Sequence, residues 1–434
     1  MRRFSTFTIA VIISFSQQVS ATTFKTEKWL TKNGVQVVFY PAMEVPMLDI
    51  SVAFKAGSAY DENHYGLSNF TTQMISQGSS GKDATAMAEA LANTGSQFNT
   101  ETNRDMVVFS LRTLTSIESL EQSTHLFSQI INHPDFPDNA FEREKKQLLM
   151  AIEQSEESPD DIANINLFKS LYHQHPYAHS VKGTTATVSA LNKKQLIDFY
   201  KQYYVSTNAV LVMVGAIDLQ KAHQIADQLT QDLSKGNPAP NIPQAMQLTK
   251  AEKINIQFPS SQTIIRLGQI GIDHKNPNYF PLMVGNYILG GGSLVSRLAV
   301  EVREKRGLTY GVNSQFTPMP GNGPFIISLS TKNNQTSNAL KITEETLNQF
   351  INDGPTKQEL ESAKQYLTGS FPLSLGSNSA IASLLLRMAF YHLPDNYLDT
   401  YLARINAVTV DEIKQAFKQQ VQPDKFSLVT VGRS

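Results

Sequence analysis

The stretch that decides the fold is GLSNFTTQMISQG, which runs from Gly66 to Gly78. It has the amphipathic pattern of a buried helix. Asn69, Thr72 and Gln73 stand at positions i, i+3 and i+4, so one helical face carries three neighbouring neutral polar side chains. This is the spacing of a metal site. None of the three residues, however, is a good zinc ligand or a general base.

Length and composition bound the protein class. A chain of 434 residues is long enough to bury two sizeable cores. With 37 basic and 38 acidic side chains it has no dominant electrostatic field, so nothing predicts binding to nucleic acid or to an anionic membrane. The chain has no cysteine, which excludes disulfides and Cys-based zinc or nucleophile chemistry.

The N-terminal segment, MRRFSTFTIAVIISFSQQVSATTF, has the features of a secretory signal. Two arginines precede a short apolar run from Phe7 to Phe15, and small residues follow at Val19 to Ala21. We therefore expect residues 1–21 to be a cleaved signal peptide and the mature protein to be soluble and periplasmic or secreted. No later stretch reaches the roughly 18 uninterrupted apolar residues that a membrane span needs.

The chain divides at SKGNPAPNIPQA, residues 234–245, where three prolines and a glycine interrupt any periodicity. We predict an N-terminal domain over 22–236, a linker over 237–245 and a C-terminal domain over 246–434.

The same order of elements recurs in both halves. A strand-like run precedes a helix, a long polar helix follows, and each half closes with a helix and a strand. The matching pairs are LDISVAFKAGSAYD with TIIRLGQIGID, FPDNAFEREKKQLLMAIEQ with GPTKQELESAKQYLTGSF, and KKQLIDFYKQYYVSTNAVLVMVGAID with VDEIKQAFKQQVQPDKFSLVTVG. We predict an α+β fold of two homologous domains, each a mixed, mainly antiparallel sheet with helices on one face.

The segment GLSNFTTQMISQGS resembles the zinc-site helix of the pitrilysin or insulinase family of metallopeptidases, the inverzincins, where it would read G-L-A-H-F-L-E-H-M. The resemblance implies that Asn69 stands for the first histidine ligand, Thr72 for the general base glutamate and Gln73 for the second histidine. It covers essentially the whole mature chain and implies a domain pair shaped like half a clam.

Two further segments extend the resemblance. FEREKKQLLMAI is similar to the helix that brings the third zinc ligand, whose position is Ala151, or Met150 with a one-residue slip, while Glu144 matches a supporting acidic residue. TGSQFNTETNRDMVVFSLRTL is similar to the strand pair whose edge receives the peptide. This implies a substrate-binding role for Gln97, Phe98, Asn99 and Thr100.

The replaced residues cannot perform zinc-hydroxide chemistry. Amide oxygens are poor zinc ligands, and threonine cannot take a proton from water near neutral pH. We therefore expect no metal and no cofactor in this chain. Asn69, Thr72 and Gln73 are then either ordinary helix residues under a loop or parts of a remodelled polar pocket.

A second motif, LGGGSLVSRLAVEVREKRGLTYGV, resembles the family's C-terminal element in which an arginine precedes a tyrosine by seven residues. Arg303 and Tyr310 have this spacing. The resemblance implies that they contact the peptide and polarise the tetrahedral intermediate, as a guanidinium and a phenol are suitable donors for an oxyanion. Gly291 and Gly292 either pack closely or form a substrate-guiding loop, because the Lys-Ser/Thr of a phosphate loop is absent.

Two other clusters have simple explanations. His173, His175 and His179 would suit a metal site, but the resemblance implies a His-Pro-Tyr turn without a catalytic role. The acidic run from Glu153 to Asp161 is typical of a solvated helix end rather than of a cation site.

Two main functions remain open. The chain is either the non-catalytic, substrate-binding subunit of a heterodimeric zinc metallopeptidase, whose H-x-x-E-H-bearing partner holds the zinc, or a peptide-binding or scaffold protein without proteolytic activity. The retained Arg303 and Tyr310 favour the first. A self-sufficient hydrolase is the weakest alternative, because the sequence has no G-x-S-x-G and no convincing His and carboxylate set.

Overall fold

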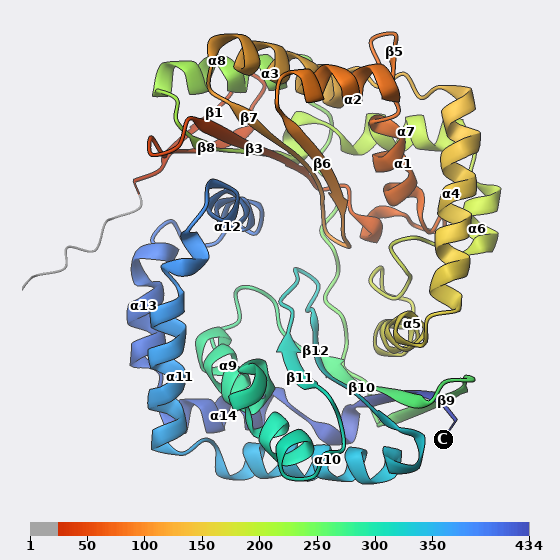
Figure 1. Cartoon of the computed structure of the whole chain (residues 1–434), viewed down its shortest axis with the longest axis vertical. Helices are drawn as coiled ribbons and strands as arrows, with labels where there is room; N and C mark the ends of the chain where they lie inside the picture. The colour runs from red at the N-terminus through yellow and green to blue at the C-terminus, as the bar shows by residue number, and fades with distance from the viewer. Residues whose placement is uncertain (1–24, 434) are drawn as a thin grey trace, which may run out of the picture.

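The computed structural model describes residues 25–433 and contains two α+β halves, one above the other in Figure 1. They are joined by a segment between Thr230 and Glu252 that has no helix or strand. The predicted linker, residues 237–245, belongs to this segment. The predicted signal peptide lies outside the described residues.

Each half is built on one mixed sheet. The first has six strands in the order β1-β2-β8-β3-β7-β6 and the second has five in the order β11-β12-β10-β13-β9. Only the pairs β2/β8 and β9/β13 are parallel within them. The strands are β1 (Glu27–Leu30), β2 (Gln36–Pro41), β3 (Met47–Phe54), β6 (Gln97–Thr102), β7 (Val107–Leu114), β8 (Ala209–Gly215), β9 (Glu252–Gln257), β10 (Gln262–Ile270), β11 (Val312–Phe316), β12 (Pro324–Lys332) and β13 (Ser427–Gly432), with β4 (Gly78–Ser79) and β5 (Lys82–Asp83) as a separate ribbon.

The helices follow the repeated order expected from the sequence. In the first half they are α1 (Leu67–Ile75), α2 (Ala84–Asn93), α3 (Ile117–Asn132), α4 (Asp138–Glu156), α5 (Pro159–Tyr172), α6 (Thr185–Ala190), α7 (Lys193–Tyr203) and α8 (Leu219–Thr230). In the second they are α9 (Tyr279–Asn286), α10 (Thr336–Asp353), α11 (Lys357–Ser370), α12 (Asn378–Phe390), α13 (Tyr397–Ala407) and α14 (Val410–Gln420). The predicted fold class is confirmed.

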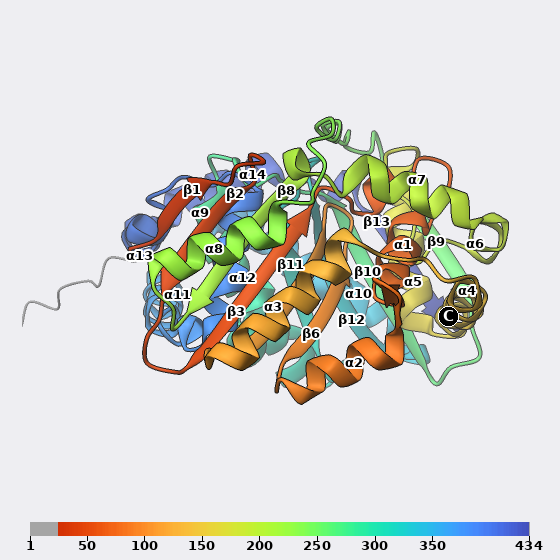
Figure 2. The same cartoon turned by 90° about the horizontal axis from the view of Figure 1, so that it is seen from above.

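The sheets differ from the expectation in having helices on both faces. Seen from above in Figure 2, α3 and α8 lie across the outer face of the first sheet. Its inner face is covered by α12, a helix of the second half, which packs on β3 and β8. In return, α5 of the first half packs on β10 and β13 of the second sheet. Each half therefore covers the other's sheet with one helix.

Helix α5 combines apolar and charged contacts with the second sheet. Leu167 is fully buried, and its side chain lies close to Gly268 on β10. Arg266, only 7% exposed, donates to Asn164 at 2.8 Å and forms an ion pair with Asp160 at 2.5 Å. A buried guanidinium without such partners would be strongly destabilising, so these contacts specify how α5 sits on the sheet.

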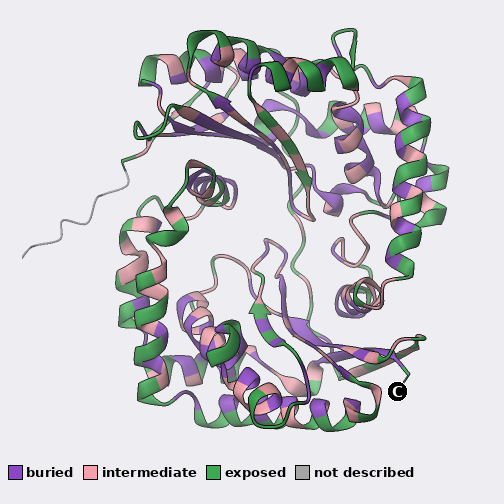
Figure 3. Ribbon diagram, viewed as in Figure 1, coloured by how far each residue is buried: buried purple, intermediate pink, exposed green. Residues whose placement is uncertain are grey.

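The contact of α12 with the first sheet is a hydrophobic core. Leu385 and Met388 of α12 belong to one buried cluster with Val38, Val212 and Val214 of the first sheet. In Figure 3 the buried residues gather on the two sheets and on α12 between them. Burial of apolar surface is the main stabilising contribution to folding. Because this core contains residues from both halves, the two halves share that stabilisation.

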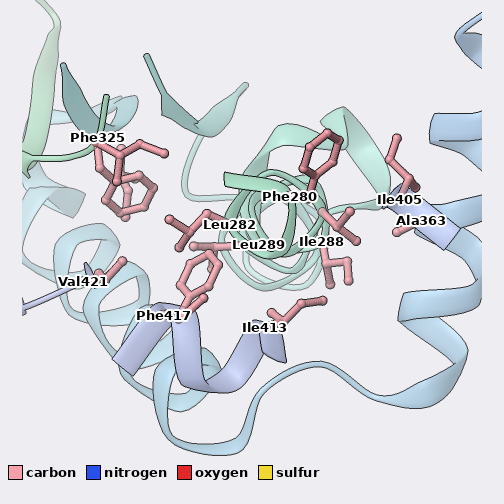
Figure 4. Packing of buried hydrophobic residues seen from close by; sticks show 14 of the residues in the cluster. Phe280, Leu282, Ile288, Leu289, Phe325, Ala363, Ile405, Ile413, Phe417 and Val421 are labelled. Atoms are coloured by element: carbon pink, nitrogen blue, oxygen red, sulfur yellow. The ribbon is translucent and has the colours of Figure 1, made fainter. Parts of the chain in front are cut away.

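The core of the second half surrounds α9. Figure 4 shows Phe280 and Leu282 of this helix among side chains of neighbouring elements, with Ile413 and Phe417 of α14 below it. A Cβ atom on Gly285 would lie 2.5 Å from the Phe417 ring. Only glycine therefore allows α9 and α14 to approach this closely.

Among the described residues no single helix is long and apolar enough to span a bilayer. One bent pair of segments, Lys357–Leu375 and Asn378–Phe390, has the length and composition of a membrane span only when both are taken together. The two segments are bent by 108° relative to each other.

We expect Leu167→Ala to lower the free energy of unfolding by about 2 to 5 kcal/mol, because it leaves a cavity between α5 and the second sheet. Since the core is shared, both halves should still unfold in one transition, as measured by chemical denaturation with fluorescence and circular dichroism. Lys169→Ala, an exposed change on the same helix, is the control and should be nearly neutral. Two separate transitions in the parent chain would contradict the shared core.

Candidate functional site

Helix α1, which carries the predicted counterpart of the zinc motif, is held at its beginning by a buried carboxylate. Asp61 accepts hydrogen bonds from the backbone N–H groups of Gly66 at 2.8 Å and Ser68 at 2.7 Å. Burial raises the pKa of the Asp61 carboxyl well above its usual value, and these two hydrogen bonds act in the opposite direction. Gly66 itself has φ 94°, and a Cβ there would clash with the carbonyl of Lys182.

Thr72, the predicted counterpart of the general base, is part of the core. It is 2% exposed, its hydroxyl donates to the Ser68 carbonyl at 2.8 Å, and it shares a hydrogen bond of 3.0 Å with the Tyr204 hydroxyl. Tyr204 is buried just after α7. The Thr72 hydroxyl therefore links α1 to the end of α7 rather than facing an open site.

The other residues predicted to stand at zinc-ligand positions lie on α1 and α4, which run antiparallel. The end of α1 meets the beginning of α4, where Arg143 donates to Gln77 at 2.6 Å and, through Nε, to the buried Glu144 at 3.0 Å. Ala151 is in the C-terminal part of α4, and Asn69 is near the beginning of α1. In an antiparallel pair these two positions lie at the same end. Asn69, Gln73 and Ala151 are half-buried, and Met150 is 53% exposed.

Within residues 25–433 no group of three or more His, Cys, Asp or Glu side chains could hold a metal ion. The three histidines after α5 have separate partners. His173 lies 3.7 Å from Glu252, His175 contacts the Pro243 carbonyl at 2.8 Å, and the His179 ring stacks on Tyr65. Their geometry is that of a packed turn.

Strand β6, the expected peptide-binding strand, is an edge strand of the first sheet, since it pairs only with β7. Gln97 and Asn99 line a pocket of about 560 Å³ between the sheet and α12. Phe98 points to the opposite face, where its ring contacts Phe109 and Phe127. Thr100 lies on the Phe98 side, because side chains alternate along a strand.

The structure brings Arg303, Tyr310 and Gly291 together in the second half. All three line one open pocket of about 570 Å³. Tyr310 is 82% exposed, and within residues 25–433 the Arg303 guanidinium forms no hydrogen bond or ion pair. Gly292 is not among the lining residues; a Cβ there would clash with the Tyr287 carbonyl.

Two π-helical segments form the wall of this Arg303 pocket. They are η3 (Tyr287–Gly291), which continues α9, and η5 (Ala299–Glu304), which carries Arg303. Such segments are rare and frequent at functional sites. A Cβ atom on Gly290 would lie 2.4 Å from the Ser314 hydroxyl, so the glycine run serves close packing against β11 as well as the pocket.

Sequence reasoning missed several polar residues of the Arg303 pocket. Asn286 donates to the Ser314 carbonyl at 3.0 Å and accepts from its hydroxyl at 2.7 Å, which joins α9 to β11. Asn313 and Gln315 are exposed on β11, an edge strand. Their alternation with buried Val312 and Ser314 is the signal that indicates a half-exposed strand.

The Arg303 pocket is equipped for binding but not for hydrolysis. Its lining offers a guanidinium, a phenol, amides and a serine hydroxyl beside an open strand edge, but no histidine and no carboxylate. Donors of this kind stabilise a carbonyl or an oxyanion. Proton transfer and water activation require a base or a metal from elsewhere.

Two protein-family models match this chain. Residues 40–185 match the model of the family described as Insulinase (Peptidase family M16), and residues 190–367 match the one described as Peptidase M16 inactive domain. An "Uncharacterized zinc protease YmxG" of Bacillus subtilis is 27% identical, covering 94% of this chain and 98% of its own, and a "Non-peptidase homolog YmxG" of Helicobacter pylori is 25% identical, covering 94% of each.

A solved structure is also similar to this chain. The crystal structure of a peptidase M16 inactive domain from Pseudomonas fluorescens is 37% identical, covers 94% of this chain and 98% of its own, and superposes with a TM-score of 0.91. The chain is therefore a member of the M16, or insulinase, peptidase family.

Proposed function

We propose that this chain is the non-catalytic, substrate-binding subunit of a heterodimeric zinc metallopeptidase that acts on peptides. In this proposal an M16 homologue with an intact H-x-x-E-H helix supplies the zinc, and this chain supplies Arg303 and Tyr310. The complex would work in the periplasm, or as a secreted enzyme, as the signal-like residues 1–21 suggest.

One observation carries the proposal: Arg303 and Tyr310 share an open pocket, and no ion pair or hydrogen bond from residues 25–433 occupies the guanidinium. A guanidinium that has no hydrogen bond or ion pair within the chain, beside an exposed phenol, is expected where a bound ligand provides that interaction. The absence of a base in this pocket agrees with a partner that performs the chemistry.

The first half supports the same division of labour. Thr72 is bonded into the core through Ser68 and Tyr204, so the former catalytic helix is now a structural element. The edge of β6 remains open, and Gln97 and Asn99 remain in its pocket. An extended peptide can therefore add to either edge strand, β6 or β11, by backbone hydrogen bonds.

We expect the purified mature chain to bind no stoichiometric zinc and to cleave no unstructured peptide, because both imidazoles, the base and the third carboxylate are absent. Elemental analysis and a peptide cleavage assay measure this. The triple change Asn69→His, Thr72→Glu and Gln73→His should leave the chain inactive, since Ala151 still replaces the third ligand. One tightly held zinc per parent chain with chelator-sensitive cleavage would contradict the proposal.

We expect the chain to co-purify from a native periplasmic extract with an M16 homologue that contains H-x-x-E-H, because each half of a shared active site needs its counterpart. Gentle affinity capture followed by native mass spectrometry measures the composition of the complex. Recovery of only the monomer or a homodimer, from an extract in which that homologue is present, would count against the proposal.

In the reconstituted complex, Arg303→Ala and Tyr310→Phe should each slow peptide cleavage by about 100- to 1000-fold, because each removes one donor aimed at developing charge. Zinc content and complex mass should stay unchanged. Steady-state kinetics with both variants measures the effect.

The matched controls are Arg306→Ala, whose guanidinium pairs with Glu301, and Tyr366→Phe, an exposed tyrosine that stacks on Tyr287. Neither residue lines the Arg303 pocket. Complexes that contain either control variant should therefore cleave the peptide at nearly the parent rate. If Arg303→Ala and Tyr310→Phe behave like the controls, the chain is a scaffold and does not contribute to the active site.

A further inference from the structure

A separate pocket of about 480 Å³ lies between the end of α4, the helix α5 and the turn that follows α5. We call it the α4–α5 pocket. It shares no lining residue with the Arg303 pocket or with the pocket beside β6. It therefore stands apart from the residues of the proposed active site.

The walls of the α4–α5 pocket are largely apolar. Ile152 comes from α4, and Ile162 and Ile165 come from α5. The two isoleucines of α5 are only half-buried, so the pocket leaves part of their apolar surface open to solvent. A hollow with this lining and volume is typical of sites that take an apolar group of a ligand.

One wall of the α4–α5 pocket is a pair of stacked rings. The centroids of the Tyr65 and His179 rings lie 4.2 Å apart, with an angle of 13° between the ring planes. The His179 Nδ1 atom contacts the Ser180 carbonyl at 3.0 Å, which fixes the ring. Burial lowers the pKa of His179, so the imidazole is neutral near pH 7 and this wall carries no charge.

The charged side chains around the α4–α5 pocket are exposed or have partners within the chain. Lys182 donates to a serine hydroxyl of α4 at 2.7 Å, and His173 lies 3.7 Å from Glu252. Lys169 and Glu156, both exposed, add one charge of each sign. Since the described lining holds no buried charge without a partner, the pocket suits a neutral group whose apolar surface supplies the affinity.

One polar group of the α4–α5 pocket keeps an unused acceptor. The half-buried Asn166 of α5 donates its side-chain N–H to the Ile162 carbonyl at 2.8 Å. Within residues 25–433 its Oδ1 atom forms no hydrogen bond. An amide oxygen of this kind accepts a hydrogen bond from an N–H group. An apolar side chain attached to a peptide N–H therefore matches both features of the lining.

The α4–α5 pocket adjoins the end of the open β6 edge. Arg104, two residues after β6, donates to the carbonyls of Tyr177 at 3.0 Å and His179 at 3.3 Å. These contacts hold the turn that carries His179 against the end of the strand. On the other side of the pocket, Tyr65 directly precedes the residue that caps α1. A peptide that pairs with β6 and continues past the end of this strand is thus led towards the pocket.

We propose that the α4–α5 pocket binds one apolar residue of a peptide. The aliphatic or aromatic side chain lies against Ile162, Ile165 and the stacked rings of Tyr65 and His179, and the backbone N–H donates to Asn166. This inference rests on the proposed function, because it takes the ligand to be a peptide added to β6. It deepens that function by a second contact, away from Arg303, which selects peptides with an apolar residue.

The experiment measures peptide binding to the mature full-length chain by isothermal titration calorimetry, without a partner subunit. The probes are an acetylated and amidated peptide of serine and threonine residues with a central phenylalanine, the same peptide with a central serine, and N-acetyl-phenylalaninamide. We expect the phenylalanine peptide to bind about 10-fold or more tighter than the serine peptide, because burial of an apolar side chain adds affinity. It should also bind more tightly than N-acetyl-phenylalaninamide, which cannot pair with β6.

Variants locate the site. Ile165→Ser should remove most of the preference for the phenylalanine peptide, whereas Asn166→Ala should weaken both peptides alike, since both offer the same N–H. Ile117→Ser, at an exposed position at the beginning of α3 and outside the pocket, is the matched control and should bind like the parent. Circular dichroism checks that each variant is folded.

The inference is overturned if the parent chain binds neither peptide, if it binds both equally, or if Ile165→Ser keeps the parent's preference. Binding of N-acetyl-phenylalaninamide as tightly as the peptide would overturn the path along β6. The roles of Arg303 and Tyr310 are measured separately, by cleavage in the reconstituted complex, so the proposed function can hold where this inference fails.

Discussion

The packing of one helix from each half on the sheet of the other is the constraint on which the rest of the structure depends. Helix α5 leaves the first half to cover β10 and β13, and α12 leaves the second half to cover β3 and β8. Neither sheet could keep its inner apolar face away from water alone. The exchange holds the two halves in one relative orientation, and thereby also places the edge strands and the Arg303 pocket.

The two halves contain a similar local arrangement with different surroundings. In each, a helix lies beside an edge strand: α1 beside β6, and α9 with η3 beside β11. In the first, Thr72 hydrogen-bonds to Ser68 and Tyr204, and the helix is part of the core. In the second, π-helical segments and a glycine run leave space for Arg303 and Tyr310. The same arrangement of helix and edge strand therefore forms part of a packed core in the first half and the wall of an open pocket in the second.

Buried polar groups explain why the halves meet in one specific way. Arg266 needs Asp160 and Asn164, and Asp105 needs the hydroxyls of Tyr177 and Tyr391, which come from different halves. Displacing either half would leave these groups buried without partners, at a cost larger than that of losing an equal apolar contact.

The sequence alone determined the local features of this protein. Periodicity and turn residues placed α1, α4, α9 and the closing helix–strand pairs, because these depend on nearby residues. The absence of histidine and glutamate at Asn69, Thr72, Gln73 and Ala151, and the spacing of Arg303 and Tyr310, were likewise readable from side-chain chemistry. Tertiary structure decided what depends on distant segments: the exchange of α5 and α12, the hydrogen bond between Thr72 and Tyr204, and the polar lining from Asn286 and Asn313. No local pattern encodes these contacts, because each joins residues that only the packed core brings together.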